Sequence, residues 1–94
     1  MKLYDDILND TNLTLDEAVL LCMYISKYIQ FKGYVIACDS SDANYLKIDR
    51  HHVSKKRKHL EELGYIKCKM QKGKPSIVQL NESILEKLEI TIYK

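Results

Sequence analysis

Glycine, proline, tryptophan and paired cysteine are scarce or missing in this sequence. It has three glycines, one proline and no tryptophan in 94 residues, which argues against a flexible linker or a glycine-rich phosphate loop. No apolar run approaches the roughly 18–20 residues of a membrane span, and the start MKLYDDILND is too acidic for a signal peptide. We therefore expect one domain, residues 1–94, in the cytoplasm, with no membrane attachment.

The cysteines Cys22, Cys38 and Cys68 form no C-x-x-C pair, so neither a disulfide framework nor a zinc ribbon is predicted. Each falls on an apolar face of its expected element, and we expect buried structural thiols. His51, His52 and His59 do not complete a four-ligand zinc set. Because no nucleophile lies beside a base and no carboxylate pair marks a cleft, we expect no enzyme activity, no catalytic residue, no metal and no cofactor.

The stretch LTLDEAVLLCMYISKYIQ is predicted to begin a helix of about four or five turns. Thr14 is a candidate N-cap, with Glu17 completing a capping box, and the helix is expected to end at Gly33. Its apolar residues exceed what one core face requires. The excess predicts a second contact surface on this helix.

A helix-turn-helix is predicted at about residues 40–63. The run YVIAC can form a short strand, a helix capped by Asp39 or Ser40 follows to about Lys47, and Asp49 can cap the next helix. That helix would end at Gly64. The residues expected to face inward are Val53, Leu60 and Leu63.

A β-hairpin is predicted at about residues 65–80. Ile66, Cys68 and Met70 alternate with Lys67, Lys69 and Gln71, and KGKP provides the turn. A C-terminal helix capped by Asn81 is expected at about 81–90, with Ile84, Leu85 and Leu88 on its apolar side. The predicted fold class is thus α+β.

Positive charge is concentrated between Lys47 and Lys74. This segment holds ten Lys or Arg and three acids, which gives +7, so the remainder must carry −5 to reach the total of +2. Such a distribution favours an anionic partner. On the helix after Asp49, residues of the first turn would suit base edges in a DNA major groove, and the following lysines would suit phosphates.

The segment YLKIDRHHVSKKRKHLEELGYIKCKMQKGKPSIVQL resembles the winged-helix segment of bacterial and phage DNA-binding proteins. These include MarR-like regulators and the N-terminal domains of DnaD-like and phage replication proteins. The residues that carry the resemblance are Ile48, Asp49, Val53, Ser54, Leu60, Leu63, Gly64, Tyr65 and Ile66.

The resemblance implies a winged helix-turn-helix: a three-helix core, a two- or three-stranded β-wing and a C-terminal helix. Residues 50–58 would be the DNA-reading helix and residues 72–74 the wing. The double-stranded DNA contacts expected from residues and resemblance together are Arg50, His51, His52, Ser54, Lys55, Lys56, Lys58, His59, Lys67, Lys69, Lys72 and Lys74. A small transcriptional regulator or a replication or partition factor of phage, plasmid or low-GC bacterial origin is expected.

Arg57 departs from the pattern of this family, which usually has an aliphatic residue four positions after Val53. A guanidinium is not buried without a partner. We expect its stem to pack and its head to reach outward, toward an acid on the helix that follows Thr14. If Arg57 contacts DNA instead, the DNA-reading helix is rotated relative to this interpretation.

A homodimer is expected, because one short helix covers little DNA and a two-fold pair doubles the contacts. The residues assigned to its interface are Tyr4, Val19, Leu20, Met23, Tyr24, Leu85, Leu88 and Tyr93. The alternative function is a winged helix that docks an acidic protein partner through its basic face. The two differ in salt dependence, since DNA affinity falls steeply as salt rises.

Overall fold

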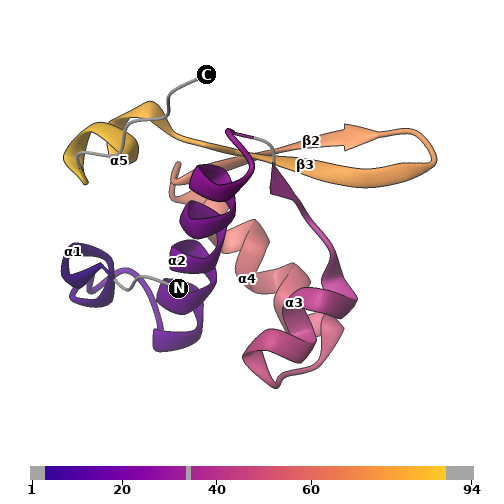
Figure 1. Cartoon of the computed structure of the whole chain (residues 1–94). Coiled ribbons are helices and arrows are strands. Elements are labelled where there is room, and N and C mark those ends of the chain that lie inside the picture. The colour runs from indigo at the N-terminus through magenta and orange to yellow at the C-terminus, as the bar shows by residue number, and fades with distance from the viewer. Residues whose placement is uncertain (1–3, 34, 89–94) are drawn as a thin grey trace.

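The chain forms a small α+β domain in a computed structural model that describes residues 4–33 and 35–88. These residues form five helices and a three-stranded antiparallel sheet (Figure 1). The elements in chain order are α1 (Asp5–Leu8), α2 (Leu15–Gln30), β1 (Val35–Ile36), α3 (Asp39–Leu46), α4 (Arg50–Glu62), β2 (Ile66–Gln71), β3 (Lys74–Leu80) and α5 (Glu82–Lys87).

Helix α2 is the centre of the core. The predicted capping box is present: the Glu17 amide donates to Thr14 Oγ1 at 3.3 Å, and the Thr14 amide donates to Glu17 Oε1 at 2.9 Å. Helix α2 contacts α1, α3, α4, β1 and β3. Because neighbours surround it on several sides, most of its wide apolar surface is covered by its own chain, whereas Leu15 and Ile29 near its two ends are exposed.

Helices α3 and α4, joined by residues 47–49, lie where the helix-turn-helix was predicted and are compatible with it. Helix α3 starts at Asp39, so Cys38 occupies the N-cap position, where Asp39 or Ser40 was expected. Asp49 is at the N-cap position of α4 but makes no side-chain hydrogen bond to the helix. Val53 and Leu60 are fully buried as predicted, whereas Leu63 is 36% exposed because it follows the last turn of α4.

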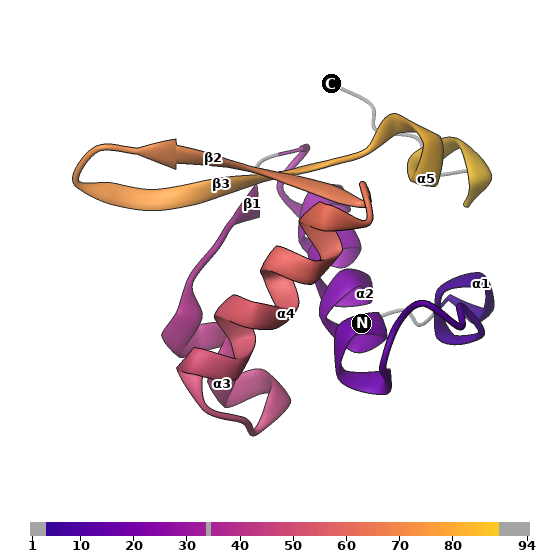
Figure 2. The same ribbon diagram turned by 180° about the vertical axis from the view of Figure 1, so that it is seen from behind.

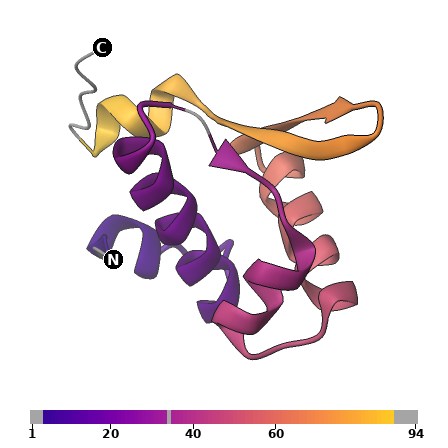
Figure 3. The ribbon, with the colours of Figure 1, turned by 45° about the vertical axis from the view of Figure 1, so that its right-hand side comes forward.

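The sheet has the order β1-β3-β2, with β2 and β3 forming the predicted hairpin. The register pairs Ile66 with Leu80 and Cys68 with Val78, so these side chains share the face that meets the helices. The hairpin extends beyond the helices, and β1 lies at its base and leads into α3 (Figure 3).

Helices α1 and α5 lie at the end of the molecule opposite the hairpin tip (Figures 1 and 2). Helix α1 was not predicted. Helix α5 starts after the predicted cap, Asn81, whose side chain accepts the Ser83 amide. It ends at Lys87, and the last residues of the expected 81–90 helix lie outside the described part of the chain.

The expectation for the cysteines is partly wrong. Cys22 is buried and Cys68 is half-buried, and burial raises the pKa of both thiols. Cys38 is exposed, because it lies between β1 and α3 at the start of a helix.

Candidate nucleic-acid interface

The outer surface of α4 carries half of the predicted contact residues. Val53 and Leu60 face the core, and at 100° per residue the opposite side of the helix is centred near Lys55. Figure 2 shows α4 in front of α2 and α3, so no other element covers this side. The exposed residues of α4 that were expected to meet DNA are Arg50, His51, His52, Ser54, Lys55 and Lys58.

Lys56 and His59 lie beside the beginning of α2, although the His59 side chain is still 41% exposed. Lys56 Nζ lies 3.7 Å from Asp16 Oδ2, and its side chain is only 21% exposed. His59 Nδ1 is hydrogen-bonded to Glu17 Oε2, and the Glu17 side chain is buried. These two predicted DNA contacts therefore have acidic partners within the domain.

Glu17 is held in its charged form by this arrangement. Burial alone would raise its pKa, but hydrogen bonds from the Thr14 amide and from His59 lower the pKa below its ordinary value of 4.5. The carboxylate accordingly serves both the start of α2 and the α2–α4 contact.

Arg57 occupies a cluster that joins three helices. Its Nε donates to the Tyr24 hydroxyl at 2.7 Å, its Nη2 to Asp42 Oδ2 at 2.9 Å and its Nη1 to Asp39 Oδ1 at 2.5 Å. The Tyr24 hydroxyl donates to Asp42 Oδ2 at 2.8 Å. Lys27 Nζ lies 3.7 Å from the other Asp42 oxygen.

The expected outward position of the Arg57 head is wrong. The side chain is 11% exposed, and its acidic partners, Asp39 and Asp42, lie on α3 and not on α2, which contributes the Tyr24 hydroxyl. Burial alone would lower the pKa of Arg57, but its contacts with Tyr24 and the two carboxylates raise it. Burial raises the pKa of Tyr24. The cluster thus contains two carboxylates, a guanidinium and a neutral phenol.

The lysines of the hairpin do not all share a surface with α4. Lys67 and Lys69 are exposed on the sheet face opposite the helices, because they alternate with Ile66 and Cys68. Lys72 is exposed in the turn at the hairpin tip. Lys74 begins β3, and its side chain lies outside the described part of the structure.

Glu61 connects α4 to the hairpin. Its Oε2 accepts the Cys68 amide at 2.7 Å, so one main-chain donor of β2 is satisfied by α4. This contact fixes the base of the hairpin relative to the end of α4. A contact of this kind could not be inferred from the local sequence pattern.

The expected dimer surface on α2 is incorrect in part. Leu20 and Tyr24 are fully buried and Met23 is 5% exposed, because these residues pack within the core of the domain. Val19, Tyr4, Leu85 and Leu88 are half-buried. Tyr93 lies outside the described residues.

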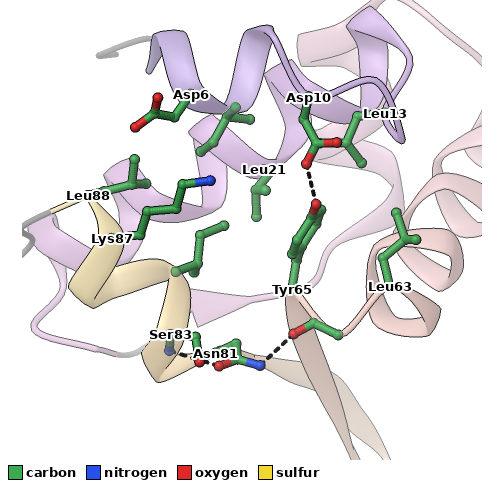
Figure 4. Close-up of a pocket in the computed structure, with 13 residues that line it drawn as sticks. Asp6, Asp10, Leu13, Leu21, Leu63, Tyr65, Asn81, Ser83, Lys87 and Leu88 are labelled. Carbon is green, nitrogen blue, oxygen red and sulfur yellow. Dashed lines mark hydrogen bonds between the residues drawn. The ribbon is translucent and has the colours of Figure 1, made fainter.

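A hollow of about 270 Å³ lies between α1, α5 and the turn after α4 (Figure 4). Its lining is mainly apolar, and Asp6 and Lys87 lie at its edge. The polar groups at its wall are already paired: the Tyr65 hydroxyl donates to Asp10, and the Asn81 amide donates to the Gly64 carbonyl at 2.6 Å. The hollow thus offers a ligand few unpaired polar groups.

Residues 4–33 and 35–88 contain no group of three or more His, Cys, Asp or Glu side chains arranged to hold a metal ion. Over the same residues, no helix has both the length and the apolar character to cross a membrane.

Compared with known proteins, the chain has no significant match to a family model, a curated protein or a solved structure.

Proposed function

We propose that this protein binds double-stranded DNA through the exposed side of α4 and the tip of the β2–β3 hairpin. The arrangement of α2, β1, α3, α4 and the hairpin is compatible with a winged helix-turn-helix, in which α4 enters the major groove. In this assignment the hairpin is the wing.

The observation that carries the proposal is that some cations of α4 pair with acids of the domain and others do not. Lys56 and Arg57 pair with acids inside the domain. Arg50, Lys55 and Lys58 are exposed, and among the described residues none of them pairs with an acid. The protein therefore presents a helix face whose positive charge exceeds its negative charge, with Glu62 as its exposed acid at the far end, and this favours a polyanion over solvent.

The residues of this face have different roles in the proposal. Arg50, His51 and Ser54 lie in the first turns of α4, where side chains of a recognition helix meet base edges. Lys55 and Lys58 lie farther along and contact phosphates, which fix position without distinguishing sequence. Lys72 reaches the neighbouring backbone or the minor groove.

Transcriptional control and replication or partition place the same physical demands on such a domain, and both fall within the proposal. Two copies related by a two-fold axis would double the contact area and place their sites about 34–36 Å apart. The partner is then a second copy of this chain.

The test is a fluorescence-anisotropy titration against a randomised duplex pool at two salt concentrations, with sequencing of the bound fraction. Enrichment of one motif, with affinity that falls as salt rises, supports a sequence-specific DNA-binding protein. If the enriched motif has two-fold symmetry, the result also supports binding as a dimer. Absence of binding at low salt refutes the proposal. In that case an acidic protein is the remaining candidate partner for the face of α4.

A further inference from the structure

The Arg57 cluster holds α4 by directional hydrogen bonds, which apolar packing does not provide. Arg57 uses Nε, Nη1 and Nη2 on three different acceptors, which belong to α2 and to two positions of α3. Hydrogen bonds of a guanidinium are directional, whereas apolar contact is not. The buried apolar residues of α4 are Val53 and Leu60, a narrow stripe. Polar contacts therefore contribute to holding the rotation of the helix: those of Arg57, the contact of His59 with Glu17, and the hydrogen bond from the Cys68 amide to Glu61.

Rotation of α4 has a direct effect on its exposed side. At a side-chain radius of about 5–6 Å, a rotation of about 20° moves a side-chain tip by about 2 Å. Hydrogen bonds to base edges tolerate a range of only about 0.5 Å in length. The atoms that fix this rotation therefore determine whether Arg50 and Ser54 can meet a base.

We propose that Arg57 is a positioning residue for DNA recognition: it fixes the rotation of α4 through Tyr24, Asp39 and Asp42 and makes no contact with DNA itself. This inference rests on the proposed function. Arg57 lies on the buried side of α4, with its head directed to α2 and α3. It therefore affects DNA specificity only indirectly, by setting the orientation of the exposed residues of α4.

The chain offers matched variants. Arg57→Met alone would leave the fully buried Asp42 without its guanidinium partner, so the test uses Asp42→Asn/Arg57→Met, which removes both ionisable groups and keeps their approximate shape. Arg57→Lys keeps the charge but cannot span three acceptors. Lys56→Met removes the neighbouring cation, whose partner is the half-buried Asp16, and is the control.

The first measurement requires no DNA. Amide residual dipolar couplings report the orientation of α4 relative to α2. We expect Asp42→Asn/Arg57→Met and Arg57→Lys to change this orientation by more than about 10° or to reduce the α4 couplings, and Lys56→Met to leave them unchanged. Wild-type couplings in the double variant would overturn the proposal.

The second measurement compares affinities for the selected duplex and a scrambled duplex. We expect the ratio to fall at least about ten-fold in the double variant, with the slope of log affinity against log salt unchanged. A slope reduced by about 0.9 would mean that Arg57 neutralises a phosphate, and an unchanged ratio would mean that it does not position α4; either result overturns the inference. If the wild-type protein binds no duplex, the proposed function fails, while the couplings still test the cluster.

Discussion

Lys55 and Lys56 are adjacent lysines in one helix, and the structure predicts different effects when each is replaced by alanine. Lys55 is exposed without an acidic partner among the described residues, whereas Lys56 is 21% exposed and lies 3.7 Å from Asp16. If each chain neutralises about five phosphates, log affinity should fall against log salt with a slope of about −4.5. Between 50 and 200 mM salt, wild-type affinity should then fall about 500-fold.

Lys55→Ala should remove one phosphate contact and change the slope to about −3.6, so that the same salt change costs only about 150-fold in affinity. Lys56→Ala should leave the slope close to the wild-type value, because that ammonium already has an acidic neighbour. The assay is fluorescence anisotropy over four salt concentrations, with urea denaturation to confirm that both variants are folded. Equal slopes for the two variants, or a larger change for Lys56→Ala, would refute the orientation assigned to α4.

Other predictions concern stability. Leu60→Ala, at a fully buried position, should lower the free energy of unfolding in urea by about 2–5 kcal/mol. Leu15→Ala, at a residue 71% exposed, should change this free energy by less than about 0.5 kcal/mol. Equal losses of stability in the two variants would contradict the assigned core. Gly64 has φ +82° with no atom within 4 Å of an added Cβ, so Gly64→Ala should cost about 1–2 kcal/mol from the backbone alone; no loss in urea denaturation would show that this φ is not required. The pKa of Glu17 is lower in the folded protein, so the charged carboxylate stabilises the fold fully above about pH 4.5, and this stabilisation is lost as pH falls below that value. The difference in Tm between wild type and Glu17→Gln should therefore shrink between about pH 5 and pH 3. A constant difference would contradict the lowered pKa.

Elements with strong local signals could be predicted from the sequence. The capping box at Thr14 and Glu17 fixed the start of α2, and the alternation from Ile66 onward gave the hairpin and its faces. Helix α1 could not be predicted in this way, because it has four residues and Ile7 is its only buried one.

The partners of the charged residues depend on contacts between distant parts of the chain. Glu17 and His59 are 42 positions apart in the sequence, and Arg57 is hydrogen-bonded to Tyr24, 33 positions away. The pattern around Val53 and Leu60 identified Arg57 as unusual but did not indicate which helix would provide its acids. Likewise, the breadth of the apolar stripe on α2 showed that it needed several neighbours, but not that they belong to the same chain.

The separation of α1 from the hairpin tip has a consequence for how the molecule meets a charged surface. Asp5 and Asp6 are exposed at one end, while Lys55, Lys58 and Lys72 are exposed on α4 and the hairpin, toward the other (Figures 1 and 2). This arrangement is a permanent electric dipole, and a polyanion exerts a torque on it that turns the cationic end forward before contact. The torque acts over a Debye length of about 10 Å at 0.1 M salt and about 3 Å at 1 M, so raising the salt concentration should slow the encounter of the protein with a polyanion.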